Sequence, residues 1–147
     1  ALTRLIGGKT DIVMMLNGAL AGLVAITAEP LTPDPITAMI IGSIGAVIMY
    51  YGTKMLESYR IDDVVGAIPV HMFAGIFGTL VVPLTNGDTS FGVQLLGVLS
   101  VCLFSFLLSW ITFGTLKATI GLRISKAAEK LGTDKAEVGV TAYSIRD

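Results

Sequence analysis

Hydrophobic residues occupy four long blocks of this chain, and charged residues are confined to the segments between and after them. Each block is close to the length of about 20 apolar residues that a helix needs to cross the hydrocarbon core of a bilayer. The pattern therefore predicts an all-α chain, a polytopic transmembrane helix bundle with four spans. The predicted spans cover about residues 11–28, 35–54, 63–82 and 91–116, and a polar tail follows over residues 117–147.

Residues that favour helix ends lie beside these blocks. Pro35 suits the first turn of the second span. Asp62 and Asp63 precede the third span, where a carboxylate can accept hydrogen bonds from free N–H groups and face the positive end of the helix dipole. In the tail, Ser125 predicts the start of a short helix over residues 126–131.

Small residues recur at helical spacing inside the first three spans. Gly18 and Gly22 form a GxxxG pair in the first span. The pattern is continued by Ala21, Ala25, Gly42, Gly45, Ala46, Gly75 and Gly78. In lipid, close approach of two backbones supplies dispersion contact that the hydrophobic effect cannot. We therefore expect tight packing between neighbouring helices at these positions.

The distribution of charge predicts the orientation of the spans. All ten Lys and Arg residues precede the first span, lie between the second and third, or follow the fourth. The only charged residues in the two other loops are the acidic residues Glu29, Asp34 and Asp88. By the positive-inside rule, both ends of the chain and its middle loop are expected on the cytoplasmic side.

The overall composition is that of a membrane protein. The chain is 53% hydrophobic and 14% charged, whereas soluble domains carry about 25% charged residues. The net charge of −1 gives no indication of nucleic-acid binding. Cys102, the single cysteine, cannot form an intrachain disulfide. The first ten residues contain no initiator methionine and lead into no signal peptide, so we expect the chain to begin within a longer protein.

His71 is the only histidine, and it lies about 12 Å into the third span when counted from Asp63 at 1.5 Å per residue. An ionisable group at this depth usually faces the bundle interior, a cavity or a translocation path. The alternative is a neutral histidine that hydrogen-bonds a neighbouring helix. Pro69 can kink the helix beside it, which suits a pore wall. For Asn17, in the first span, we expect an interhelical hydrogen bond.

Motifs of enzyme chemistry are absent from the sequence. There is no GxSxG elbow, no cluster of metal ligands and no Gly-rich phosphate loop. One histidine is insufficient for a haem clamp, which would draw on further axial ligands. We therefore predict no enzyme activity, no catalytic residue, no cofactor and no metal.

Several segments resemble the ammonium transporter (Amt) family. Residues 17–28, NGALAGLVAITA, are similar to the eighth span of that family. Residues 60–80, RIDDVVGAIPVHMFAGIFGTL, are similar to its tenth span, which carries one of two pore histidines. Residues 93–97, VQLLG, are similar to part of the eleventh span, and residues 117–123, KATIGLR, to the start of the cytoplasmic tail.

The resemblance implies that the chain is the C-terminal portion of an eleven-span, inverted-repeat ammonium transporter, consisting of spans eight to eleven and the tail. His71 would be the second pore histidine in an otherwise apolar conduit for ammonium or ammonia, which excludes ions that cannot shed a proton. The family further implies a homotrimer in the lipid bilayer of the inner (plasma) membrane. It also implies a missing N-terminal portion that carries the first pore histidine, and a PII-type regulator at the tail.

Four departures from the family pattern are visible. Met72 stands where the family commonly has glycine, and Val64 stands where proline is usual. In the tail, residues 132–134 (GTD) replace Gly-Leu-Asp, and residues 138–140 (VGV) replace His-Gly-Glu. Two alternatives to transport therefore stay open: a transporter-like sensor, or a non-conducting structural remnant, acting through the cytoplasmic tail.

Overall fold

Every regular element of the chain is helical in the computed structural model, which describes residues 2–142. The prediction of an all-α chain is therefore confirmed for these residues. Residue 1 and residues 143–147, which include the basic residue Arg146, lie outside the described residues. The elements are α1 (Leu2–Gly7), α2 (Ile12–Thr27), α3 (Pro35–Ser58), the π-helix η1 (Ile68–Phe73), α4 (Ala74–Val81), the short 3₁₀-helix η2 (Val82–Leu84), α5 (Phe91–Thr119), α6 (Lys126–Leu131) and the π-helix η3 (Asp134–Val138).

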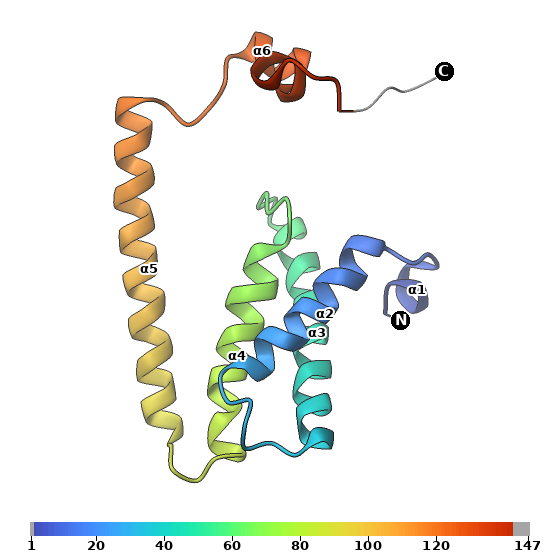
Figure 1. Cartoon of the computed structure of the whole chain (residues 1–147), viewed down its shortest axis with the longest axis vertical. Helices are drawn as coiled ribbons and strands as arrows, with labels where there is room; N and C mark the ends of the chain where they lie inside the picture. Colours follow the sequence, from blue (N-terminus) through green and yellow to red (C-terminus); the bar gives the residue numbers. More distant parts are fainter. Residues whose placement is uncertain (1, 143–147) are drawn as a thin grey trace. The chain divides into compact units, whose positions relative to one another are not determined.

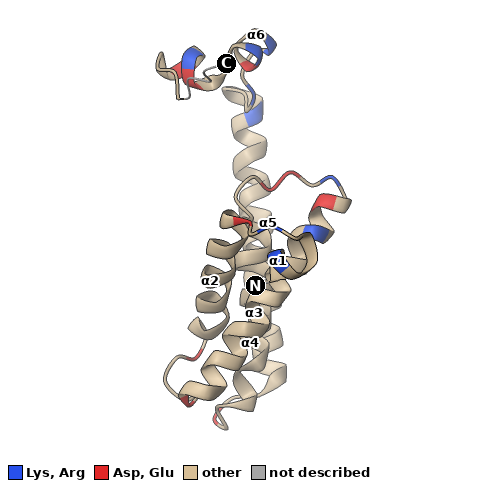
Figure 2. Ribbon diagram, turned by 90° about the vertical axis from the view of Figure 1, so that its right-hand side faces the viewer, with Lys and Arg blue, Asp and Glu red and all other residues tan. Residues whose placement is uncertain are grey.

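The chain divides into two units, residues 1–101 and residues 102–147. In the first unit, α2, α3 and the helix formed by η1 and α4 pack side by side (Figure 1). Their shared core contains Ala21, Met49, Val70 and Ala74, each at most 2% exposed. Figure 2 shows that Lys, Arg, Asp and Glu lie near the ends of these helices and in the connecting segments.

The predicted contacts between small residues are confirmed where α2 crosses α3 and α4. A methyl group on Gly22 would lie 3.1 Å from the carbonyl oxygen of Gly42, and one on Gly45 would lie 2.6 Å from the Cβ of Ala25. A methyl group on Gly78 of α4 would overlap the backbone of Ala25. The three helices can approach this closely only because these positions carry little or no side chain.

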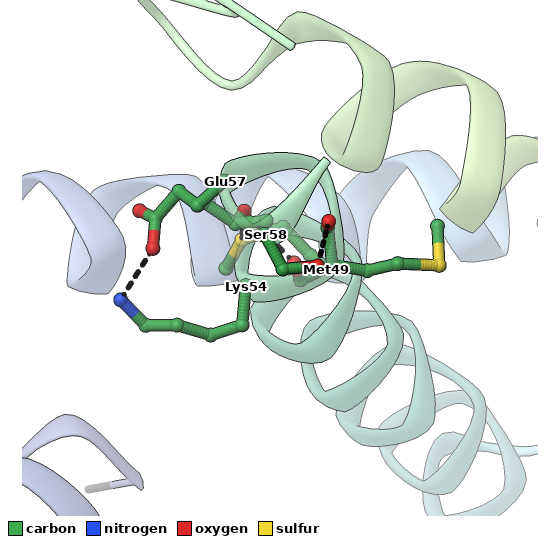
Figure 3. Close-up of polar contacts among 6 residues, drawn as sticks. Met49, Lys54, Glu57 and Ser58 are labelled. Carbon is green, nitrogen blue, oxygen red and sulfur yellow. Dashed lines mark hydrogen bonds and ion pairs between the residues drawn. The ribbon is translucent and has the colours of Figure 1, made fainter. Parts of the chain in front are cut away.

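The second long helix begins at the predicted proline. Asp34 is its N-cap, and one carboxylate oxygen accepts hydrogen bonds from the N–H groups of Ile36 (2.9 Å) and Thr37 (3.2 Å). Pro35 follows in the first turn, where its missing N–H group costs nothing. The helix continues past residue 54, so Lys54 and Glu57 form an ion pair of 2.8 Å in its last turns (Figure 3).

The helix that carries His71 begins at Ile68, five residues later than the predicted start of the third span at residue 63. The backbone from Val64 to Gly66 forms a turn instead, and Gly66 has a φ of +73°. A right-handed helix requires negative φ, so it cannot include this glycine.

Two helices, α3 with 24 residues and α5 with 29, are long and apolar enough to cross a membrane. By contrast, α2 and the segment Ile68–Leu84 are apolar but shorter. At 1.5 Å per residue, α2 is about 24 Å long, against a hydrocarbon core of about 30 Å. No described side chain of α5 is buried within the chain.

In the second unit, the predicted tail helix is confirmed as α6. Its N-cap is Ser125, whose hydroxyl accepts a hydrogen bond of 3.2 Å from the N–H of Ala128. The following π-helix η3 lacks a counterpart in the sequence-based prediction. The carboxylate of Asp134 at its start accepts a hydrogen bond of 2.9 Å from the N–H of Ala142, which lowers the pKa of Asp134.

Candidate functional site

His71 lies within the π-helix η1, which begins one residue before Pro69. A proline suits this first turn, because the first N–H groups of a helix have no partner within it. The helical bond of the next residue is present, from the N–H of Val70 to the carbonyl of Gly66 at 3.1 Å. Turns of the π type are rare and are frequently found at functional sites.

The carbonyl of Val65, in the turn before η1, accepts a hydrogen bond from the side chain of Asn17. The side-chain amide of Asn17 donates a hydrogen bond of 2.9 Å to this oxygen across 48 residues of sequence. The sequence predicts an interhelical bond for Asn17, whereas its partner lies in the turn before η1 and is a backbone group. Asn17 thus joins α2 to the turn before η1, which is a different task from joining two helices.

The two aspartates before η1 differ in their contacts. The carboxylate of Asp63 accepts hydrogen bonds from the N–H groups of Ala67 (2.9 Å) and Ile68 (2.8 Å), both at the start of the helix. Asp62 is exposed and makes no side-chain hydrogen bond within residues 2–142. The structure therefore brings Asn17 and Asp63 together around the turn that leads to His71, but it leaves Asp62 apart from them.

The π-helix has one buried side and one exposed side. Pro69 and Val70 are buried, and Ala74, the first residue of α4, is fully buried. His71 and Met72 are exposed on the surface of the chain. The imidazole makes no hydrogen bond with any other group of residues 2–142, so the structure does not contain the bond to a neighbouring helix considered as the alternative.

Two contacts that the sequence did not predict also hold this region. Gly52 of α3 is buried against Phe73 and Pro69 of η1. In the segments that follow α2 and η2, the side chains of Glu29 and Asn86 form a hydrogen bond of 2.9 Å, which lowers the pKa of Glu29. Each contact joins residues at least 17 positions apart in sequence, and no local sequence motif predicts such a pair.

The residues that the structure describes offer no cluster of metal ligands, and the cavity described next lies away from His71. No group of three or more His, Cys, Asp or Glu side chains that could hold a metal ion occurs within residues 2–142. A cavity of about 340 Å³ lies beside α1 instead, and His71 is not among its lining residues. That cavity is lined by Thr3, Gly7, Lys9, Thr10, Asp11, Met14, Tyr50 and Lys54. The chemistry available at η1 is therefore that of one exposed imidazole on an otherwise apolar surface.

Comparison with known proteins shows one consistent relationship. The sequence profile of the Ammonium Transporter Family matches residues 1–143. The ammonium transporter Amt2 of Archaeoglobus fulgidus is 39% identical, over 97% of this chain and 35% of its own length. The ammonium transporter of Corynebacterium glutamicum is 31% identical over 97% of this chain and 35% of its own length. Ammonium transporter 1 of Dictyostelium discoideum is 31% identical over 92% of this chain and 33% of its own length. The chain thus spans about a third of the length of these relatives.

Proposed function

Because the chain belongs to the ammonium transporter family, we propose that it is the C-terminal part of a protein that moves ammonium across a membrane, and that His71 lines the conducting path. The observation that carries the proposal is the placement of the imidazole. It is exposed, it has no hydrogen-bond partner within residues 2–142, and it stands in a segment without Lys, Arg, Asp or Glu from Val64 to Gly87. A solitary ionisable group in such a segment is favoured where it faces a pore.

The chemistry of imidazole fits this substrate. A neutral imidazole has one N–H donor and one nitrogen acceptor, so it can bind ammonia as donor or acceptor and can accept a proton from ammonium. The neighbouring exposed side chain is the apolar Met72. An apolar passage offers no ligands to replace the hydration shell of an alkali cation. Ammonium differs from such an ion because it can give up its proton.

We further propose that α2, α3, the helix of residues 68–84 and α5 are the four spans, with residues 117–147 as a cytoplasmic tail. The lengths of α3 and α5 support spanning directly. A shorter span such as α2 can be accommodated by local thinning of the bilayer. The basic residues before the first span, between the second and third, and after the fourth support the orientation.

The larger assembly rests on the family resemblance alone. In it, the remaining N-terminal spans complete an eleven-span inverted repeat and supply a second pore histidine. Three copies form the transporter in the inner (plasma) membrane. A PII-type regulator binds the tail.

Substitution of His71 tests the role of the imidazole. His71→Ala in the full-length protein should strongly reduce the ammonium-dependent current at equal membrane expression. Ser43→Ala is a matched control, because the hydroxyl of Ser43 bonds only the carbonyl of Met39 in its own helix, at 2.7 Å. An unchanged current in the His71 variant, with normal expression, would remove His71 from the mechanism.

A further inference from the structure

Gly52 of α3 lies against the segment that carries His71. A methyl group at Gly52 would lie 2.5 Å from Cδ2 and 3.0 Å from Cε2 of Phe73, and 3.2 Å from the Cβ of Pro69. Both neighbours belong to η1, and they lie on either side of His71 in sequence. The missing side chain of Gly52 therefore sets how closely the π-helix can approach α3.

The two ends of this segment are held by other contacts. At its start, Asn17 binds the carbonyl of Val65, and Asp63 binds the N–H groups of Ala67 and Ile68. Beyond its end, the fully buried Ala74 leads into α4, which lies directly against α2. Because both ends of η1 are held, a larger side chain at Gly52 cannot move the whole of η1 away from α3. The displacement is therefore confined to residues 69–73.

We propose that Gly52 is a positioning residue for His71: by letting the rings of Phe73 and Pro69 lie against α3, it fixes where the imidazole is presented. This inference rests on the proposed function, in which His71 meets the substrate. Gly52 itself is buried in α3 and faces Phe73 and Pro69, whereas His71 is exposed.

A spectroscopic experiment reads this geometry without relying on transport. The full-length protein is labelled with ¹⁵N in its histidine rings, and His71→Gln identifies the resonances of His71 by their loss. Gly52→Ala should displace these resonances. Gly45→Ala is the control, because a methyl group there is also crowded, at 2.6 Å from the Cβ of Ala25 and 2.9 Å from the carbonyl oxygen of Ala21, but meets α2 and not η1. It should leave the His71 resonances in place.

A compensating substitution separates positioning from simple destabilisation. Phe73→Val removes both ring atoms that a methyl group at Gly52 would meet, so the double variant Gly52→Ala/Phe73→Val should return the His71 resonances most of the way to their original positions. If Gly52→Ala alone does not fold, Phe73→Val alone relaxes the same contact and should displace the resonances. Resonances that stay in place in every folded variant overturn the proposal.

Transport measurements then distinguish the two proposals. The ratio of ammonium to methylammonium transport should change with Gly52→Ala but not with Gly45→Ala. The factor by which Gly52→Ala changes this ratio should differ by roughly twofold or more between the wild-type protein and the His71→Gln variant. A roughly twofold difference is the lower end of the coupling measured between interacting residues. Normal transport by His71→Gln, together with displaced resonances in Gly52→Ala, would refute the pore role of His71 and leave the positioning by Gly52 standing.

Discussion

Gly78 of α4 lies directly against the backbone of Ala25 in α2, and its replacement by alanine gives a sharp test of how these helices pack. A methyl group on Gly78 would overlap the carbonyl oxygen of Ala25 and would lie 2.8 Å from the carbonyl carbon and the Cα of that residue. The atoms in the way belong to a helix backbone, so no side-chain rotation can relieve the overlap. The two helices must separate.

The size of the effect follows from two opposing terms. Overpacking a close contact costs about 1–3 kcal/mol, and an overlap with rigid backbone belongs at the upper end of that range. Replacing glycine by alanine inside a helix returns about 1 kcal/mol. We therefore expect Gly78→Ala to destabilise the fold by about 2 kcal/mol.

Gly75, one turn earlier in α4, is the matched control. A methyl group there would meet only Cγ1 of Val24, at an ordinary contact distance of 3.6 Å. Gly75→Ala should therefore be neutral or stabilising by up to about 1 kcal/mol. The assay is the free energy of unfolding of the full-length protein in detergent, from denaturant titration of both variants and wild type. Equal stability of the two variants would refute the close crossing of α2 and α4.

Three further predictions concern polar contacts. Asp63→Ala should lower the free energy of unfolding by about 1–2 kcal/mol through loss of its hydrogen bonds with the N–H groups of Ala67 and Ile68. Asp62→Ala should change it by less than about 0.5 kcal/mol, and equal effects in the same titration would contradict the assignment. The hydrogen bond from Asn86 lowers the pKa of Glu29 below 4.5, so it stabilises the fold above that pH and is lost as the pH falls through the lowered pKa. Asn86→Ala should therefore be less stable than wild type at neutral pH, and the difference should narrow below pH 4.5; a difference independent of pH would count against this contact. Ser125→Ala should remove about 1 kcal/mol of local stability from α6, seen as faster hydrogen exchange of the amides of residues 126–131, and unchanged exchange would show that the cap is dispensable.

Features that depend on residue type and helical spacing could be predicted from the sequence. Close packing between helices at Gly22, Gly42 and Gly78 follows from the small residues repeated along each apolar segment. Pro35 at the start of α3 and Ser125 at the start of α6 follow from the backbone preferences of those residues at helix starts. These predictions need no knowledge of which segments are neighbours in space.

Features that depend on distant contacts could not be predicted. The apolar pattern of the third span does not distinguish an α-helical turn from the π turn of η1. Pro69 does not decide between them either, since a proline is compatible with the first turn of both. The sequence pattern puts the start of that helix too early, at residue 63. The positive φ of Gly66 that ends the helix there belongs to a turn held by Asn17 and Asp63, which are distant from each other in sequence. The contact between Gly52 and Phe73 could not be predicted either, because the two residues are distant in sequence and neither belongs to a motif that indicates the other.

Asn17 and His71, the two polar side chains that stand out within the apolar segments, differ in their contacts. The carbonyl of Val65 lies in the turn before η1, outside the helix, and it accepts a hydrogen bond of 2.9 Å from the amide of Asn17. The side chain of Asn17 is therefore committed to the backbone. His71, two residues after Pro69, has no such commitment within residues 2–142. The turn before η1 is thus held by α2, while the imidazole of His71 is exposed on the surface of the chain.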